Sequence, residues 1–549
     1  MIINLKKISL LISGLFFFFQ SFAQECDYII TPGEDTFIDG EALNVQPGQT
    51  ICVEQGYTDQ FLKFVNIHGT AEEPIIITNY NGLVAIDTDH HFGIVLDNCS
   101  HIIFSGQGSP QVQYGFNIIR TKGNGFGIGA MSTNIEVKYI EISNAKDVGL
   151  LAKTDPDCTF EAIRDNFTMY NTKLHHLNIH DCGTEGMYIG SSKYTGQYLP
   201  DCDITVLPHV MEGVEVYSCR ISDSGWDGIQ VSSATKDCYI YNNLIINDSQ
   251  KGDEFQMSGI LIGGGTSCEC YNNMILDGKG SGIEIFGKGD IKVFNNIIVN
   301  PGQSHNPGNA TINKYGIFCK DVENTTVQGS SIHFFNNTII NPRTHGINYR
   351  NTRTSNNKSY NNCIINPGAY SIDGESAYVH TETAINMDLR NNFFNLDISK
   401  AKFENVSNYN FFPISSSPLV NTGLDLSSYG VNFDYNGFSR PWRGLFDIGA
   451  YECNYADVSI DEHTENSLIS ISPNPVKTFI QFDLSKLPNG AVDITIFSLN
   501  GKFIRTIAKQ MIIDSTIKKR YNLEDLDKGI YIIQFQGEKY NYSKKLIKL

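Results

Sequence analysis

A short phrase of two asparagines, three mostly apolar residues and a closing Asn or Asp recurs through the middle of the chain. Complete copies occupy residues 242–247, 272–277, 295–300, 336–341 and 361–366, and an imperfect copy begins at Asn391. Successive copies start 23 to 41 residues apart, which suits one turn of a solenoid with loops of variable length. A short apolar run closed by Asn on both sides is typical of a buried strand between turns.

Asparagine suits both the backbone and the stacking of such a solenoid. It tolerates the left-handed conformation that a sharp turn requires, and its amide can bond to an identical residue above or below it. The repeat therefore predicts a parallel β-helix. We expect Asn296 and Asn337 to be buried at turns and bonded to neighbouring coils.

A second phrase, a Gly followed by alternating apolar residues, recurs from Gly93 to Gly346. From Gly149 onward it roughly alternates with the Asn phrase, as expected for two faces of one coil. A single coil cannot bury its apolar side alone, so coils stack and the ends of the stack need caps. Residues 26–51 are the expected N-terminal cap.

The start of the chain predicts export. Lys6 and Lys7 precede an apolar run at residues 8–19, and Ser21, Phe22 and Ala23 provide a small-residue cleavage site. This pattern indicates a signal peptide over residues 1–23. A membrane anchor is the alternative, but the run is short for a bilayer, and no later segment is long and apolar enough to span one.

The net charge of −18 argues against nucleic acid or anionic lipid as a partner. Thirteen cysteines in an exported chain suggest disulfides, although their number is odd. Cys238, Cys268 and Cys270 fall in columns that hold apolar residues in the other copies, which favours core positions. A metal site at Cys268 and Cys270 is a weaker alternative, because no second ligand pair follows at metal spacing.

The region after the repeats carries a recognisable closing pattern. Its residues are Asp434 to Gly437, Arg440 and Pro441, and then Asp447 to Glu452. This resembles the closing segment of many bacterial secreted β-helix proteins. We therefore expect a β-helix with its cap and closing segment over residues 24–453, followed by a polar linker at 454–466.

The last part of the chain, residues 467–549, contains four further motifs. They are 471–475, 494–502, 526–531 and the basic end 544–549. In order and spacing they resemble the C-terminal sorting domain of the type IX secretion system of Bacteroidetes. The residues alone predict short alternating strands in an immunoglobulin-like sandwich. The resemblance implies the secretion machinery as a partner, and release or attachment at the outer cell surface.

The expected fold is all-β, a right-handed parallel β-helix followed by a small immunoglobulin-like β-sandwich. The β-helix resembles the pectate-lyase-like superfamily, which includes polysaccharide lyases and glycoside hydrolases. That resemblance implies a secreted or surface protein acting on or binding an extracellular polysaccharide, and it does not decide the reaction. No lyase or polygalacturonase active-site motif matches. A non-catalytic surface adhesin or structural β-helix protein is the alternative.

The candidate catalytic residues are Glu185 and Asp227, each directly before a Gly of the second phrase. Stacked coils lie about 4.8 Å apart, so the two carboxylates would be separated by nearly the distance of a retaining glycosidase pair, about 5–5.5 Å. Like charges this close raise one pKa, which suits an acid and a base. Two alternatives stay open: carboxylates before a turn Gly often bond backbone amides, and such a pair can bind Ca²⁺.

Further residues near this pair are candidates for substrate binding: Tyr188, Trp226, Gln230, Lys193 and Glu284. Tyr188 and Trp226 offer faces on which a sugar ring can stack. Glu284 considered alone reads as a solvated residue of the outer face. Two coils are inflated by residues 155–171 and 191–213, which are adjacent in coil order and could line one groove.

Overall fold

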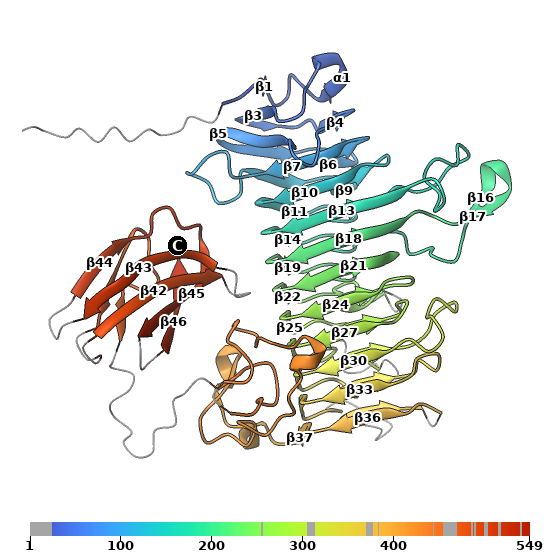
Figure 1. Ribbon diagram of the computed structural model, residues 1–549. Coiled ribbons are helices and arrows are strands. Elements are labelled where there is room, and N and C mark those ends of the chain that lie inside the picture. The colour runs from blue at the N-terminus through green and yellow to red at the C-terminus, as the bar shows by residue number, and fades with distance from the viewer. Residues whose placement is uncertain are drawn as a thin grey trace, which may run out of the picture.

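The computed structural model describes residues 25–549, except 254–255, 305–312, 369–376, 383, 443, 454–468, 485–486, 488–489, 499–502, 514–517 and 538–540. The expected signal peptide at 1–23 and linker at 454–466 lie outside the described residues. Within them, parallel strands stack in successive coils from the N-terminal end to about residue 395 (Figure 1). The predicted all-β parallel β-helix is confirmed.

Each coil contributes one short strand to a twelve-stranded sheet. Its strands are β2 (Phe37–Asp39), β4 (Leu62–Val65), β6 (Phe92–Asp97), β9 (Asn124–Gly129), β12 (Leu150–Ala152), β15 (Met187–Ile189), β20 (Ile229–Val231), β23 (Ser258–Ile262), β26 (Ser281–Ile285), β29 (Ile317–Cys319), β32 (Ile347–Tyr349) and β35 (Val379–Thr381). Neighbours in this order pair in parallel, as in β15 with β20.

The remaining strands of the coils form a 23-stranded sheet with two parallel runs. The first run is β1 (Tyr28–Ile30), β3 (Thr50–Thr58), β5 (Ile75–Asp87), β7 (Ser100–Ser105), β10 (Thr133–Lys138), β13 (Thr168–His175), β18 (Val210–Tyr217), β21 (Ala234–Tyr241), β24 (Cys268–Tyr271), β27 (Ile291–Phe294), β30 (Ile332–Phe335), β33 (Asn357–Tyr360) and β36 (Met387–Arg390). The second run, which starts from β5, is β8 (Phe116–Arg120), β11 (Ile140–Ser143), β14 (Asn178–His180), β19 (Arg220–Ser222), β22 (Leu244–Ile246), β25 (Met274–Leu276), β28 (Ile297–Val299), β31 (Thr338–Ile340), β34 (Cys363–Ile365) and β37 (Phe393–Asn395).

The Asn phrase forms the turn between these two runs. Its first Asn adopts positive φ in every copy, with values from 46° to 57°. Its second Asn is buried in the five complete copies and belongs to a ladder: Asn273 Nδ2 donates to Asn296 Oδ1 at 3.0 Å, and Asn296 Nδ2 donates to Asn337 Oδ1 at 3.0 Å. The backbone N–H of Asn296 also donates to Asn337 Oδ1, at 3.1 Å. The predicted burial and coil-to-coil bonding of Asn296 and Asn337 are confirmed.

The Gly phrase is required by close packing inside the coil. A Cβ built on Gly186 would lie 2.6 Å from the carbonyl oxygen of Gly228 and 2.6 Å from a methyl group of the core residue Ile221. The same clash recurs at Gly228, against Gly259 and Ile245. Any side chain here would separate neighbouring coils, so the Gly marks where each coil approaches the next most closely.

Residues 26–51 do more than cap the stack. They contain the helix α1 (Gly40–Leu43), whose N-terminal amides bond the Asp39 carboxylate, but also β1 and β2, the first strand of each sheet. Cys26 is bridged to Cys52 of β3. The expected cap is therefore an incomplete first coil covered by a short helix.

The closing segment packs along the side of the last coils. It includes η2 (Ile398–Ala401), β38 (Phe403–Asn405), η3 (Val406–Asn408), β39 (Asn410–Pro413) and η4 (Ser427–Tyr429). Asn336 Nδ2 donates to the carbonyl oxygens of Asp447 and Gly449, so the closing motif binds the Asn turns directly. A buried ion pair joins Arg440 to Glu452 at 2.6 Å within this motif.

The sorting region folds as two antiparallel sheets that share one apolar core. One sheet contains β40 (Ser470–Ser472), β41 (Phe479–Asp483) and β44 (Lys518–Asn522). The other contains β42 (Gly490–Ser498), β43 (Phe503–Ile513), β45 (Gly529–Gly537) and β46 (Asn541–Lys548). Phe482 and Phe535 contact each other edge to face in the core between them. This agrees with the predicted small sandwich.

The cysteines divide into two groups. Two disulfides are present, Cys26–Cys52 and Cys158–Cys202, and the other nine cysteines are buried and form no disulfide. Cys238 and Cys268 are Cα partners on adjacent coils, with their sulfur atoms 3.2 Å apart. Their assignment to the core is confirmed. Among the residues that the structure describes, no helix has the length and apolar character needed to cross a membrane.

Candidate functional site

The outer face of the twelve-stranded sheet carries two parallel columns of side chains. The first holds the residue before each Gly: Glu185, Asp227, Ser258, Ser281, Tyr315 and His345. The second holds, in Cα register, Tyr188, Gln230, Leu261, Glu284, Phe318 and Asn348. The Tyr315 ring stacks on the rings of Phe318 and His345, at 5.0 and 5.8 Å between centroids. The two columns therefore lie side by side on one surface.

Glu185 and Asp227 occupy adjacent coils in the first column. The backbone N–H of Gly186 donates to the Asp227 carbonyl oxygen at 3.0 Å, so the two residues are stacked as the sequence predicted. Both side chains are buried, with 2% of Glu185 and 1% of Asp227 exposed. The pair is thus enclosed rather than open to solvent.

The Asp227 carboxyl group is held on one side only. Its Oδ1 accepts hydrogen bonds from the backbone N–H of Ser258 at 2.7 Å and from the Ser258 hydroxyl at 2.6 Å. Its Oδ2 is buried and has no hydrogen-bond partner among the described residues. Burial raises the pKa of Asp227 well above its usual range, the Ser258 hydrogen bonds oppose this, and repulsion from Glu284 and Glu185 adds to it.

The pKa values of Glu185 and Glu284 are raised as well. Burial raises the pKa of Glu185, and the charge of Lys153 opposes that rise. Burial likewise raises the pKa of Glu284, whose Oε1 lies 4.0 Å from Lys314 Nζ. Glu284 is therefore not the solvated residue that its position alone suggested, because only 13% of its side chain is exposed and Lys314 lies beside it. Three carboxyl groups of raised pKa share this face.

The candidate substrate-binding residues are only partly brought together. Tyr188 lies directly above Gln230 in the second column, and Glu284 follows two coils below Gln230 with Leu261 between them. Lys153 lies over the Tyr188 ring at 4.9 Å, and the Tyr188 hydroxyl donates to Ser192 at 2.8 Å. Gln230 is 1% exposed, so its outward position does not give it contact with solvent.

Trp226 and Lys193 are connected to the pair less directly. Trp226 is half-buried, and its backbone N–H donates to the Thr184 carbonyl oxygen at 3.1 Å. Thr184 and Trp226 directly precede Glu185 and Asp227 in the sequence. Lys193 is exposed on the loop that follows β15, and its backbone N–H bonds the Ser191 hydroxyl at 3.2 Å. Lys193 therefore belongs to the loop, whereas Tyr188, Gln230 and Glu284 belong to the sheet face.

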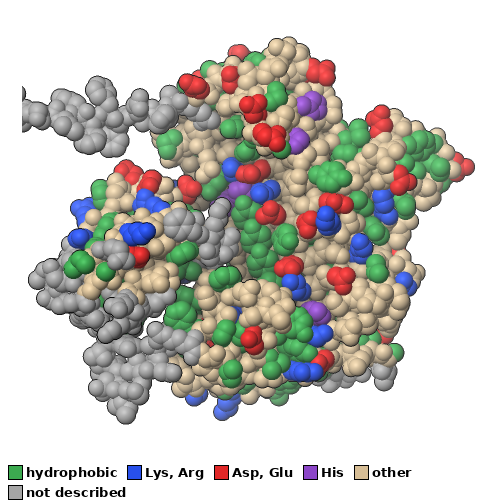
Figure 2. Space-filling model, viewed as in Figure 1, with side chains coloured by type: hydrophobic (Ala, Val, Ile, Leu, Met, Phe, Trp, Pro, Cys, Tyr) green, Lys and Arg blue, Asp and Glu red, His purple; other side chains and the backbone are tan. Residues whose placement is uncertain are grey.

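The two inflated coils are physically joined. The disulfide between Cys158 and Cys202 links their loops, and the second loop projects as a hairpin of β16 (Gln197–Leu199) and β17 (Ile204–Val206). Figure 2 shows apolar side chains gathered on the projecting loops, where Tyr198, Ile204 and Leu207 are exposed. The same coil also reaches along the sheet: Tyr194 packs on Gly265, and the Thr195 hydroxyl donates to Glu323 at 2.6 Å.

The roles of two residues at this surface, Lys314 and Ser258, could not be predicted from the sequence. Lys314 lies in a turn between coils, outside both repeated phrases, so no column pointed to it. Ser258 belongs to the predicted first column, but its type gave no indication that it donates twice to Asp227. Within the described part of the chain, no cluster of three or more His, Cys, Asp or Glu side chains has the geometry of a metal site.

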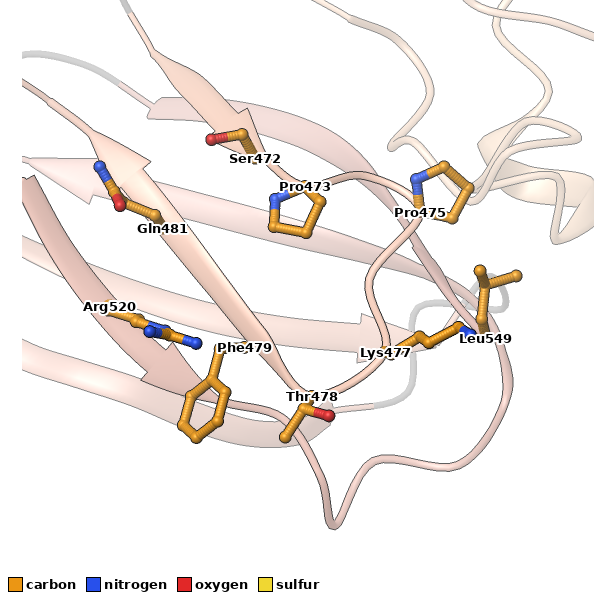
Figure 3. Close-up of a pocket in the computed structure, with 9 residues that line it drawn as sticks. All are labelled: Ser472, Pro473, Pro475, Lys477, Thr478, Phe479, Gln481, Arg520 and Leu549. Carbon is orange, nitrogen blue, oxygen red and sulfur yellow. The ribbon is translucent and has the colours of Figure 1, made fainter.

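A separate hollow of about 660 Å³ lies on the sorting domain (Figure 3). Phe479 and Arg520 line it, with the Arg520 guanidinium 4.2 Å from the centre of the Phe479 ring. Lys477 and the terminal Leu549 form another part of its rim. It contains none of the candidate catalytic or substrate-binding residues.

Comparisons with known proteins identify both parts of the chain. Residues 167–394 match the family model described as right handed beta helix region, and residues 470–549 match that of the secretion system C-terminal sorting domain. The β-helix is accordingly right-handed. The sorting domain directs export through the type IX system to the cell surface or the extracellular space. No curated protein sequence matches the chain.

Several solved structures are similar. A pectate lyase, Pel9A, is 12% identical with a TM-score of 0.43, covering 78% of this chain and 97% of that one. A lacto-N-biosidase of family GH136 from Eubacterium ramulus is 11% identical with a TM-score of 0.44, covering 67% and 68%. A polysaccharide lyase of family PL6 from Pseudopedobacter saltans is 13% identical with a TM-score of 0.40, covering 78% and 100%.

Proposed function

We propose that this exported right-handed β-helix protein acts on an extracellular polysaccharide through the outer face of its twelve-stranded sheet. The observation that carries the proposal is the set of three carboxyl groups, Glu185, Asp227 and Glu284, that share this face and have raised pKa values. Perturbed carboxyl groups gathered at one place are a recurrent property of acid–base sites.

The chemistry follows from the differences among these groups. Asp227 is the strongest candidate for a proton donor, because burial raises its pKa well above the usual range and its Oδ2 is free of hydrogen bonds among the described residues. Glu284, which faces the cation Lys314, is the better candidate for an ionised base or nucleophile. The half-buried Tyr188 ring and the loops joined through Cys158 and Cys202 are our candidates for holding a sugar chain.

The deciding experiment is a screen of the purified chain on polysaccharides, read by reducing ends and by ultraviolet absorbance. Hydrolysis creates reducing ends alone, whereas elimination also creates an absorbing double bond. On the polysaccharide that is cleaved, Glu185→Gln, Asp227→Asn and Glu284→Gln should each lower turnover by at least about a hundredfold, the usual contribution of an acid or base.

The matched control is Glu269→Gln on the 23-stranded sheet, where a carboxylate pairs with Lys292 at 2.5 Å. It should keep full turnover. Glu185→Gln, Glu284→Gln and Glu269→Gln should keep the wild-type melting temperature to within a few degrees at neutral pH, and Asp227→Asn should not melt below the wild type. Full activity in all three site variants would exclude this surface as the catalytic one.

A second candidate function is favoured by one specific observation. Asp227 is 1% exposed and bonds Ser258 twice, as expected for a carboxylate that ties one coil to the next. On this reading the protein is a non-catalytic surface adhesin or structural β-helix protein. Binding of a polysaccharide without any cleavage, together with a lower melting temperature in Asp227→Asn, would support it.

Calcium is the third role open to the pair of Glu185 and Asp227, because oxygen ligands from stacked carboxylates suit that ion. Calorimetric titration of the chelator-treated chain with Ca²⁺ tests it. Saturable binding that disappears in both Glu185→Gln and Asp227→Asn would assign the pair to an ion. Heat equal to that of dilution would remove calcium from the proposal.

A further inference from the structure

The last coil of the β-helix has unpaired strand edges. Each of its strands pairs on one side only within the described chain: β35 with β32, β36 with β33 and β37 with β34. Figure 1 shows β36 and β37 at the lower end of the stack, with the closing segment beside them. At the opposite end, α1 covers the first coil. A free strand edge presents N–H and C=O groups that readily accept another strand.

The apolar core is open at the same place. Leu389 ends an inward column that continues upward through Ser359, Phe334 and Val293. Those three residues are fully buried, whereas Leu389 is 46% exposed. Met387, its neighbour in the same strand, also packs against the core while only partly buried. A terminal apolar layer of this kind ordinarily needs a cap.

The asparagine ladder is also interrupted here. Asn362 Nδ2 donates to Asn392 Oδ1 at 3.1 Å, and Asn392 Nδ2 donates back to the Ser359 carbonyl oxygen at 2.7 Å. In each earlier rung the same nitrogen donates also to the Asn of the following coil, as Asn337 does to Asn362. Asn392 has no following coil in the described chain. Hydrogen bonding, strand pairing and apolar packing thus all stop at one surface.

We propose that this end binds the same end of a second copy of the chain, with β36 of the two copies paired antiparallel about a two-fold axis through Leu389. Such a contact is isologous: the same surface is used by both copies, so every contact between two different residues occurs twice. If the two-fold axis is perpendicular to the sheet, the second copy of β36 runs in the opposite direction. The core-facing side of the sheet is then the same in both copies. The two Leu389 side chains then meet and close both cores.

The charges of β36 select this partner. Asp388 and Arg390 flank Leu389 and point outward, and at present they pair with each other at 2.8 Å. Antiparallel pairing centred on Leu389 places Asp388 of one copy opposite Arg390 of the other, at two symmetric positions. Opposite charges directly across a strand pair are stabilising and like charges are destabilising. Leu396, which directly follows β37 and is exposed, extends the apolar area at this end.

The test is the oligomeric state of the full secreted chain, measured by sedimentation and by light scattering over a range of concentrations. The wild type should form a dimer. Asp388→Arg and Arg390→Asp should each weaken it at least about tenfold, because each places like charges opposite each other. The double variant with both changes should dimerise again. A mixture of the two single variants should form a heterodimer, because two cations then face two anions.

Two further variants separate the interface from the fold. Leu389→Asp should abolish the dimer while retaining the β-sheet circular dichroism of the wild type. Lys122→Glu, a charge reversal on an exposed side chain in an early coil, should leave the dimer unchanged. A wild type that stays monomeric at every concentration would overturn the proposal. So would single charge variants that dimerise like the wild type, or a mixture that forms no heterodimer.

Discussion

Asp227 and Ser258 are joined across two adjacent coils by two hydrogen bonds, from the Ser258 backbone N–H at 2.7 Å and from its hydroxyl at 2.6 Å, both to the same carboxylate oxygen. The second oxygen is buried and has no partner in the described chain. Asp227 Oδ1 therefore links the two coils through hydrogen bonds, and Oδ2 is available to carry a proton. Asp227 is structural if its main role is the Oδ1 hydrogen bonding to Ser258, and catalytic if its main role is proton transfer at Oδ2.

The first prediction concerns the pH dependence of stability. Burial raises the pKa of Asp227 above its unfolded value. The stability associated with such a group is fully present below the unfolded pKa and is lost as pH rises through the folded pKa. Asp227→Asn cannot ionise, so it should resemble the wild type at about pH 4 and melt at a higher temperature at about pH 8. Thermal melts across this range measure the effect. Parallel curves for the two proteins would show that Asp227 ionises freely in the fold.

The second prediction concerns the asparagine ladder. Asn296 donates to Asn337 and to the Cys270 carbonyl oxygen, and it accepts from Asn273, all in the buried interior. Asn296→Leu or Asn337→Leu should lower the free energy of unfolding by about 3 kcal/mol, because several buried polar groups lose their partners together.

Denaturant titration measures this loss, with Asn408→Leu on the exposed surface as the control, which should change stability by less than about 0.5 kcal/mol. Unchanged midpoints in both ladder variants would mean that the amides contribute little beyond the backbone bonds.

The third prediction concerns delivery. Residues 470–549 form the sorting domain and have an apolar core of their own, distinct from that of the coils. Deleting residues 467–549 should leave the protein in the periplasm with an intact β-helix, because the export address is lost while the coils keep their packing. Cell fractionation measures the location of the shortened chain, and circular dichroism of the purified fragment measures whether the β-helix is intact. Normal surface delivery of the shortened chain would contradict the assignment.

Much of the fold was readable from sequence because its determinants are local and repeated. The first Asn of the Asn phrase, with its positive φ, marks the same turn in each copy, and the Gly of the second phrase, where a Cβ would clash, marks the same point of each coil that carries it. Burial on the outer face was not readable in this way. Gln230 alternates with the core residues Ile229 and Val231 in its strand, yet it is 1% exposed, and sequence spacing does not record what buries it.

The candidate site shows the same division. The stacking of Glu185 on Asp227 followed from the repeat, whereas the approach of Lys314 to Glu284 depends on a turn without a repeated signal. The disulfide between Cys158 and Cys202 was equally hidden, since thirteen cysteines permit many pairings. Sequence periodicity thus located the surface, and only tertiary structure supplied its charge balance.

The fourth prediction concerns the closing motif. Arg440 pairs with Glu452 at 2.6 Å in the interior and also donates to Asn295 Oδ1 at 3.2 Å and to the Gly449 carbonyl oxygen at 2.8 Å. The Arg440 guanidinium thus connects two parts of the closing segment with each other and with the Asn295 turn of the coils. Arg440→Met should cost about 3–5 kcal/mol, because it leaves the Glu452 carboxylate buried without its cation.

The matched control is Arg120→Met, which removes ion pairs with Asp87 and Asp89 that are partly exposed and should cost less than about 1 kcal/mol. Both values come from denaturant titration of the full chain. Limited proteolysis gives a second measurement: in Arg440→Met, cleavage between residues 398 and 453 should precede cleavage of the coils, because the segment has lost its main attachment. Equal stability of the two variants, with no early cleavage, would show that the apolar contacts of the closing segment hold it without the buried pair.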